Sequence, residues 1–378
     1  MTDKAKSSSS NESPATKGTK GASFKLPFAP DSGSLNTARC RTSSRSNMAE
    51  LEKMTDWPKF IELLEGKDGP QAREKVNEAD FLAHLRSRVK GQDPILVDVA
   101  RLIRLQLAKD QKGRPVCNLL FLGPTGTGKT ELAKAIAEFL FDDEKAMVRF
   151  DCSEFTGPES KTRLIGTPLG YIGSEMGGQL TRPMMAKPRR LILFDEIEKA
   201  YREVFDLFLQ MMGEARLTEQ GSGNVVDFSK AIIILTSNAH SEQIGRIQKE
   251  VSDSYEMVNA VKGYLTDTKV FRPEILGRID KVYVFQPLEG MVVAEIALLK
   301  LAKLGKEYGL RVQFVAPELV MRALIANQKV SRFGIRELER ILFDMFAVPM
   351  TDAKDNGAKN VVIAVESDGS ISVRPAQP

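Results

Sequence analysis

The sequence has few cysteines and histidines and no long apolar run. Its three cysteines, Cys40, Cys117 and Cys152, stand far apart, and His84 and His240 are its only histidines. This spacing gives neither a disulfide framework nor a Cys/His zinc site. No segment approaches the roughly 18 apolar residues of a membrane span, and the first residues lack the apolar core of a signal peptide. We therefore expect a cytoplasmic protein.

A strong excess of charge of one sign is also absent. The chain has 54 Lys and Arg residues against 50 Asp and Glu residues, which gives a formal net charge of +4. Bulk electrostatics therefore gives no clear reason to expect nucleic-acid binding. The 378 residues, 42% of them hydrophobic and 28% charged, have the composition of a globular protein of two or three domains.

Residues 1–48 differ in composition from the rest of the chain. Segments such as SSSSNESPATKGTKG and RTSSRS are rich in Ser, Thr, Lys and Gly, which predicts a disordered tail. An organellar targeting sequence is the alternative, and Asp3, Glu12 and Asp31 argue against it. Residues 49–84 have apolar side chains at spacings of three and four, which predicts a helical lead-in segment. Trp57 in this segment is a candidate contact with an adaptor or a substrate.

A glycine-rich loop between a predicted strand and a predicted helix gives the strongest chemical signal. The apolar run 116–122 is followed by GPTGTGKT and then by a helix with one apolar face. Glycines let the backbone N–H groups of such a loop surround a phosphate beside the helix N-terminus. Lys129 supplies a positive charge at the β- and γ-phosphates, and the Thr130 hydroxyl is suited to bind Mg²⁺. The pattern predicts a site for a nucleoside triphosphate.

Polar side chains follow two further apolar strands. The run 191–194 is followed by Asp195 and Glu196, and the run 231–235 is followed by TSN, which ends in Asn238. Ligands of doubly wound sheets bind at the carboxyl ends of the strands. Asp195 is therefore predicted to hold Mg²⁺ through water, and Glu196 to polarise the water that attacks the γ-phosphate. Asn238 is predicted to orient that water or to sense the γ-phosphate.

Eight ordered segments resemble the ATPase module of the Clp protein-unfoldase and disaggregase family of AAA+ proteins, specifically the second module of ClpB and ClpA. They are RVKGQ, LLFLGPTGTGKTELAKAIAEFLF, AMVRFDCSEF, RLIGTPLGYIGSEMGGQL, LILFDEIEKA, ARLTEQGSGNVVDFSKAIIILTSN, FRPEILGRID and FGIRELER. ClpX shares the phosphate loop, but GYIGSEMGG and RLTEQG are more similar to ClpB and ClpA.

The resemblance implies an α/β fold, that of an AAA+ P-loop NTPase. A large ATPase domain with a parallel sheet is expected at 85–287. A small, mainly helical C-terminal domain is expected at 288–378, with short strands at 312–315, 361–365 and 371–373.

The resemblance also implies an activity. The chain is expected to hydrolyse ATP with Mg²⁺ as part of a homo-oligomer, a hexamer, and to thread a polypeptide substrate through an axial pore. The residues that the motifs assign to nucleotide binding are Val89, Lys90, Gly123, Pro124, Thr125, Gly126, Thr127, Gly128, Lys129, Thr130 and Asp195.

Two arginines match catalytic positions of the family. Arg278, within GRID, matches the arginine finger that reaches the nucleotide of a neighbouring subunit. Arg336, within FGIRELER, matches the arginine that the small domain places over the phosphates. A planar guanidinium stabilises the charge that hydrolysis spreads over the γ-phosphoryl oxygens. The sequence departs from the family at Gly277, where Asn is common, and at Ile335, where Ala is common.

The segment 170–173, Gly-Tyr-Ile-Gly, resembles the loop with which these rings grip polypeptide. An aromatic ring such as that of Tyr171, beside Ile172, contacts side chains of many kinds because apolar and π surfaces need no particular partner. The resemblance places a second axial loop at 219–223.

Other features of the family are missing from this sequence. It has no second ATPase module, no repeat N-domain and no coiled-coil insertion of the ClpB middle-domain kind. Docking to a peptidase is not expected, because the nearest match to the hydrophobic docking tripeptide is Ile244-Gly245-Arg246, whose third residue is charged. Two alternatives stay open: a torsin-like or assembly-specific ATPase that switches a partner protein without threading it, and a remodeller of nucleic acids.

Overall fold

The computed structural model describes residues 76–109, 113–143, 146–329 and 334–376. The predicted tail and most of the predicted lead-in segment, including Trp57, lie outside the described residues. The first described helix, α3 (Glu78–Arg88), crosses the predicted division between residues 84 and 85. Its Phe81 and Leu85 are buried in the same core as the central sheet.

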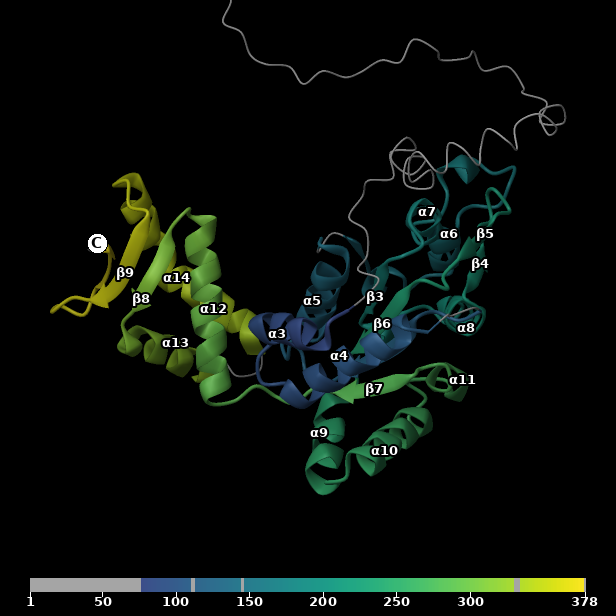
Figure 1. Ribbon diagram of the computed structural model, residues 1–378, viewed down its shortest axis with the longest axis horizontal. Helices are drawn as coiled ribbons and strands as arrows, with labels where there is room; N and C mark the ends of the chain where they lie inside the picture. The colour runs from purple at the N-terminus through teal and green to yellow at the C-terminus, as the bar shows by residue number, and fades with distance from the viewer. Residues whose placement is uncertain (1–75, 110–112, 144–145, 330–333, 377–378) are drawn as a thin grey trace, which may run out of the picture. The chain divides into compact units, whose positions relative to one another are not determined.

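Five parallel strands form the central sheet (Figure 1). They are β1 (Cys117–Leu122), β2 (Met147–Asp151), β3 (Leu191–Asp195), β6 (Ile232–Ser237) and β7 (Lys281–Val284), in the spatial order β2-β3-β6-β1-β7. Every neighbouring pair is parallel. The predicted α/β fold with a parallel sheet is therefore confirmed. The three strands predicted from apolar runs agree with β1, β3 and β6 to within two residues.

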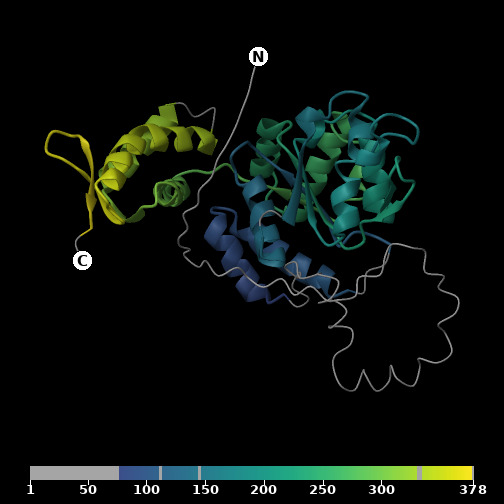
Figure 2. The same ribbon diagram turned by 90° about the horizontal axis from the view of Figure 1, so that it is seen from above.

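Helices cover both faces of this sheet, as Figure 2 shows. Successive strand side chains point to opposite faces, so Leu119 and Phe121 join one core cluster while Leu120 and Leu122 join the other. The first cluster is completed by α3, α4 (Asp93–Leu107) and α5 (Lys129–Phe141). The second draws on α6 (Ser160–Ile165), α7 (Thr181–Ala186), α8 (Val204–Glu214), α9 (Ser241–Glu250), α10 (Ser254–Asp267) and α11 (Pro273–Leu276).

A two-stranded hairpin lies outside the central sheet. It consists of β4 (Arg216–Thr218) paired antiparallel with β5 (Val225–Asp227). Residues 219–224 form its tip. These strands are three residues each, too short for an apolar pattern to predict them from sequence.

The C-terminal part has a core of its own. The helices α12 (Met291–Glu307), α13 (Pro317–Lys329) and α14 (Gly334–Asp355) pack with a sheet of order β10-β9-β8, made of β8 (Arg311–Val315), β9 (Asn360–Val365) and β10 (Ile371–Pro375). The expected helical domain with three short strands is confirmed. Nowhere in the described residues is there a helix with both the length and the apolar composition that crossing a bilayer requires.

Parallel topology brings the predicted site residues to one edge of the sheet. In the pairing of β1 with β6, Leu122 lies opposite Ser237, and in the pairing of β3 with β6, Phe194 lies opposite Leu235. The glycine-rich loop, the acidic pair and Asn238 therefore leave three neighbouring strands at the same end. This is the edge at which open α/β sheets bind ligands.

Candidate nucleotide site

The glycine-rich loop has a backbone that side chains would not permit. Gly123, Gly126 and Gly128 have φ angles of 135°, 82° and 100°. A Cβ on Gly123 would stand 2.6 Å from the carbonyl oxygen of Phe285. The helix α5 then starts at Lys129 with no side-chain cap from Gly128, so the N–H groups of its first turn are not occupied by a capping side chain. Loop and helix end thus form a cradle suited to a phosphate group.

Lys129 is buried beneath this loop. Its Nζ donates hydrogen bonds to the carbonyl oxygens of Gly123 at 2.7 Å and Pro124 at 2.8 Å. Burial lowers the pKa of Lys129 to about 8, although the negative charge of Asp195 opposes the shift. Because little water screens the ammonium here, its charge acts strongly on a phosphate oxygen.

Asp195 is the centre of a network at the end of β3. Its Oδ2 accepts a hydrogen bond from Thr130 Oγ1 at 3.2 Å and pairs with Arg149 Nη2 at 2.7 Å. Its Oδ1 accepts a hydrogen bond from the hydroxyl of Thr236. Among the described residues, no group of three or more His, Cys, Asp or Glu side chains is placed to hold a metal ion by itself. One hydroxyl and one carboxylate fit Mg²⁺, which takes few protein ligands and completes its shell with phosphate oxygens and water.

Glu196 follows Asp195 with an uncommon backbone. Its φ of 55° and ψ of 49° place it in the left-handed region, which is strained for a residue with a side chain and is often found at functional sites. Its Oε1 accepts a hydrogen bond from Asn238 Nδ2 at 3.3 Å. Its Oε2 pairs with Lys199 Nζ. Both oxygens of the predicted base are therefore held in place by neighbouring side chains.

One cavity of about 1040 Å³ collects these groups. The predicted site residues that line it are Val89, Lys90, Thr125, Gly126, Thr127, Gly128, Lys129, Thr130, Asp195, Glu196, Asn238 and Arg336. Gly123 and Pro124 do not line the cavity, but their carbonyl oxygens accept hydrogen bonds from Lys129, which does. A Cβ on Gly126 would stand 3.1 Å from the backbone nitrogen of Ile335, so the start of α14 lies directly on the loop.

Comparison with known proteins agrees with this geometry. Residues 114–282 match the family model described as AAA domain (Cdc48 subfamily). This part of the chain is an AAA domain. Outside that segment the similarity continues, as the relatives below show.

The chain is similar to several Clp proteins. It is 39% identical over 306 residues to the negative regulator of genetic competence ClpC/MecB of Bacillus subtilis, covering 77% of this chain and 37% of the relative. It is 44% identical over 273 residues to the chloroplastic chaperone protein ClpB2 of Oryza sativa, covering 70% and 28%. With heat shock protein 100 of Trypanosoma brucei it shares 46% identity over 211 residues, covering 54% and 23%. The chain thus spans about a third or less of these relatives, and the predicted resemblance to Clp proteins is confirmed.

Arg278 lies away from the nucleotide cavity of this AAA domain. It does not line the cavity, it follows α11 and it is exposed. Its backbone carbonyl accepts a hydrogen bond from Asn118 Nδ2 at 3.0 Å, which anchors it to β1. Its guanidinium rests on α8, where a Cβ on Gly213 would stand 2.6 Å from Nη1.

Tyr171 and Ile172 also lie apart from the cavity, in the loop between α6 and α7. Tyr171 is 69% exposed and Ile172 is fully exposed, and the neighbouring Leu169 and Met176 are exposed as well. Gly170 and Gly173, on either side of the pair, both have positive φ angles. The AAA domain therefore presents an apolar loop tip that no described residue covers.

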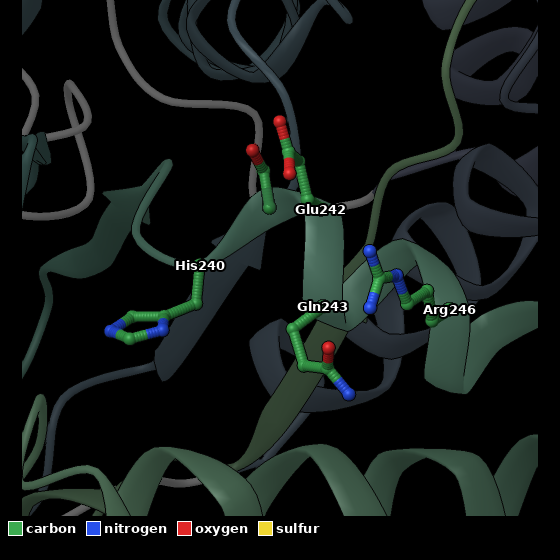
Figure 3. Close-up of a pocket in the computed structure, with 5 residues that line it drawn as sticks. His240, Glu242, Gln243 and Arg246 are labelled. Carbon is green, nitrogen blue, oxygen red and sulfur yellow. The ribbon is translucent and has the colours of Figure 1, made fainter.

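A second cavity, of about 490 Å³, lies at the start of α9 (Figure 3). It is lined by His240, Ser241, Glu242, Gln243 and Arg246, and it shares no residue with the nucleotide cavity. In Figure 3 the His240 ring points away from the Arg246 guanidinium, so these side chains do not converge on one point. The tripeptide at 244–246 is part of helix α9, and Ile244 is buried, so it forms no exposed docking loop.

Four residues near the site were missed from the sequence. Thr236, Arg149 and Lys199 bind the acidic pair, and Gln92 donates from Nε2 to the carbonyl of Gln286 at 2.9 Å beside the loop. All four fall within the matching segments, which was the available signal. The orientation of Arg149 and Lys199 toward the acidic pair had no signal in the sequence.

Proposed function

We propose that this chain binds ATP with Mg²⁺, hydrolyses it within a ring of subunits, and uses the energy to unfold and thread polypeptide. The observation that carries the proposal is the single cavity in which Lys129, Asp195 and Glu196 meet Arg336. A phosphate cradle, a metal-binding carboxylate, a second carboxylate and an arginine are the parts that phosphoryl transfer to water requires. The names of the Clp relatives, which include chaperones and a heat shock protein, support the same activity.

Each residue has a defined task in this proposal. The loop N–H groups and Lys129 hold the β- and γ-phosphates, while Thr130 and Asp195 hold the cation. Bound Mg²⁺ supplies charge neutralisation at the phosphate oxygens. Glu196 accepts the proton of the attacking water, and Asn238 fixes the carboxylate that does so. Arg336 adds positive charge from the small domain.

A ring of subunits explains why Arg278 lies outside the cavity of its own chain. Because this arginine is exposed and does not line the cavity of its own chain, it is available to reach the cavity of a neighbour. Head-to-tail contacts of this kind form a ring when the rotation between successive subunits closes. We propose a homo-hexamer, in line with the resemblance of the motifs to hexameric Clp proteins.

The exposed loop tip of Tyr171 and Ile172 is the proposed contact with the polypeptide. It shares no residue with the nucleotide cavity, which suits a part that transmits force rather than one that takes part in the chemistry. Its apolar surface tolerates many sequences.

The experiment that tests this function uses Glu196→Gln, with Lys129→Ala as the matched variant. Glu196→Gln is expected to bind ATP normally and to lose hydrolysis, because the amide cannot accept the proton. Lys129→Ala is expected to weaken binding itself. Glu196→Gln should also retain polypeptide substrates, which mass spectrometry of the purified complex would identify. Normal Mg²⁺-dependent turnover in Glu196→Gln would refute the role of Glu196.

A further inference from the structure

The Glu219 carboxylate is buried where the tip of the β4–β5 hairpin meets the loop that carries Tyr171, a segment far from it in sequence. Glu219 is 1% exposed and begins the tip of the β4–β5 hairpin, residues 219–224. The other segment is the loop 166–178, which carries Tyr171. The backbone N–H of Gln220 donates to the carbonyl of Ile165 at 2.8 Å, so a main-chain hydrogen bond also joins the hairpin tip to the end of α6, directly before this loop.

Gly166 and Gly221 allow this close approach, and Gly178 brings the two ends of the Tyr171 loop together. A Cβ on Gly166 would overlap Glu219 Oε1, and a Cβ on Gly221 would overlap the carbonyl oxygen of Ser174. A Cβ on Gly178 would overlap the carbonyl oxygen of Leu164. We name the set of Gly166, Gly178, Glu219 and Gly221 the glycine joint. A side chain at Gly178 or Gly221 would displace backbone of the opposite segment, whereas one at Gly166 would displace the Glu219 carboxylate.

The carboxylate within the glycine joint is incompletely satisfied. Its Oε2 accepts a hydrogen bond from the backbone N–H of Ser222 at 2.5 Å, whereas Oε1 has no hydrogen-bond partner among the described residues. Burial raises the pKa of Glu219, but hydrogen bonds from Ser222 and Gly221 outweigh it, so the pKa lies below its ordinary value. A buried, charged oxygen without a partner costs free energy. Sequences retain such costs mainly where they serve function.

We infer that Glu219 is a positioning residue that locks the Tyr171 loop to the hairpin tip, so that the two move as one unit when the ring pulls polypeptide. This inference rests on the proposed threading function. Gly221 lies directly against the Ser174 carbonyl, backbone to backbone, and Gly166 lies against the Glu219 carboxylate. Force on Tyr171 therefore passes through the glycine joint to β4 and β5, and from there to α8, whose last residues precede β4 directly.

Gly221→Ala tests the inference without removing any side chain, since it adds one methyl group that pushes against the Ser174 carbonyl. The matched control is Gly245→Ala in α9, where a Cβ meets nothing within 4 Å. Spin labels would be placed at Glu175→Cys and Asn224→Cys, both exposed positions, in a Cys40→Ser background. Cys117 and Cys152 are buried and stay unlabelled. Labelled chains are diluted into unlabelled ones so that only distances within one subunit are measured.

The distance distribution between the labels is expected to be narrow and the same with ADP as with a non-hydrolysable ATP analogue, in the parent and in Gly245→Ala. In Gly221→Ala it is expected to broaden or to change with the nucleotide. A parent distribution that shifts between nucleotides, or one unchanged by Gly221→Ala, would overturn the inference. This readout stands whether or not the protein unfolds polypeptide.

A functional measurement on the same proteins completes the test. The ATP hydrolysed per molecule of unfolded reporter is expected to rise about tenfold in Gly221→Ala and in Glu219→Ala, within the range of coupling between sites. Glu219→Gln keeps the size of the side chain and an acceptor for Ser222, and is expected to recover part of the loss. If the parent unfolds the reporter and Gly221→Ala does so at the same ATP cost, the inference fails while the proposed function survives. If the parent unfolds nothing, the proposed function fails, and the spin-label result alone decides on the joint.

Discussion

The side-chain amide of Asn238 donates to Oε1 of Glu196 at 3.3 Å. The same nitrogen lies 3.3 Å from the Thr125 hydroxyl of the phosphate loop. One residue at the end of β6 thus links the predicted base at the end of β3 with the loop after β1. This contact provides a route by which a γ-phosphate at the loop would affect the position of the base.

Asn238→Ala is therefore expected to slow hydrolysis more than it weakens binding. Loss of the amide leaves Glu196 held by Lys199 alone, so kcat for ATP should fall about tenfold to a hundredfold while KM changes little. Steady-state kinetics with Mg²⁺ and varied ATP measures both. A large rise in KM with unchanged kcat would instead assign Asn238 to ground-state binding.

Because the pKa of Lys129 is lowered, we expect both the stability of the fold and the affinity for ATP to depend on pH. Its pKa is lowered from 10.5 to about 8 in the folded protein without nucleotide. Between these values the unfolded chain binds more protons than the folded one, so the contribution of Lys129 to the free energy of unfolding rises with pH across that window. ATP requires the charged form, so its affinity changes in the opposite direction.

The dissociation constant for ATP, measured by fluorescence with a labelled analogue, is expected to rise about tenfold between pH 7 and pH 9, because about a tenth of Lys129 stays protonated at pH 9. Lys129→Arg is the control, since a guanidinium stays charged throughout. Its affinity should be independent of pH. Equal pH dependence in both proteins would place the titrating group elsewhere.

The guanidinium of Arg278 can rest on α8 because Gly213 has no side chain. A methyl group here would stand 2.6 Å from Nη1, at the flexible end of the arginine, so the fold should tolerate Gly213→Ala while the guanidinium moves. ATP turnover by the oligomer is expected to fall by up to about a hundredfold, the scale of losses from a displacement of about 1 Å in a catalytic group. ATP binding should be unaffected. Gly245→Ala provides the comparison, and equal turnover in the two variants would show that Arg278 does not need its place on α8.

Sequence alone predicted three strands of the central sheet, each a continuous apolar run, but neither of its edge strands, β2 and β7. The strands β1, β3 and β6 are buried along their whole length, and each is followed by a polar motif. The edge strand β2 was not predicted as a strand, because its residues are mostly half-buried or exposed and include Arg149. The hairpin strands β4 and β5 were too short to give a period.

The site was predictable to the extent that a motif lies next to a strand end. Lys129, Asp195 and Glu196 share one cavity as expected, since parallel strands end at one edge. The left-handed backbone of Glu196 and its ion pair with Lys199 depend on local geometry after β3 that no residue pattern specifies. The glycine joint likewise depends on segments that meet only in three dimensions.

Variants of Tyr171 distinguish ATP hydrolysis that drives threading from hydrolysis that does not. Basal ATP hydrolysis and unfolding of a tagged, stably folded reporter would be measured on the same preparations of the parent, Tyr171→Phe and Tyr171→Ala. All three are expected to hydrolyse ATP at similar basal rates. Tyr171→Phe is expected to unfold the reporter nearly as well as the parent, because the aromatic ring contacts the polypeptide, and Tyr171→Ala is expected not to unfold it. Reporter unfolding by Tyr171→Ala at the parent rate would contradict threading through this loop.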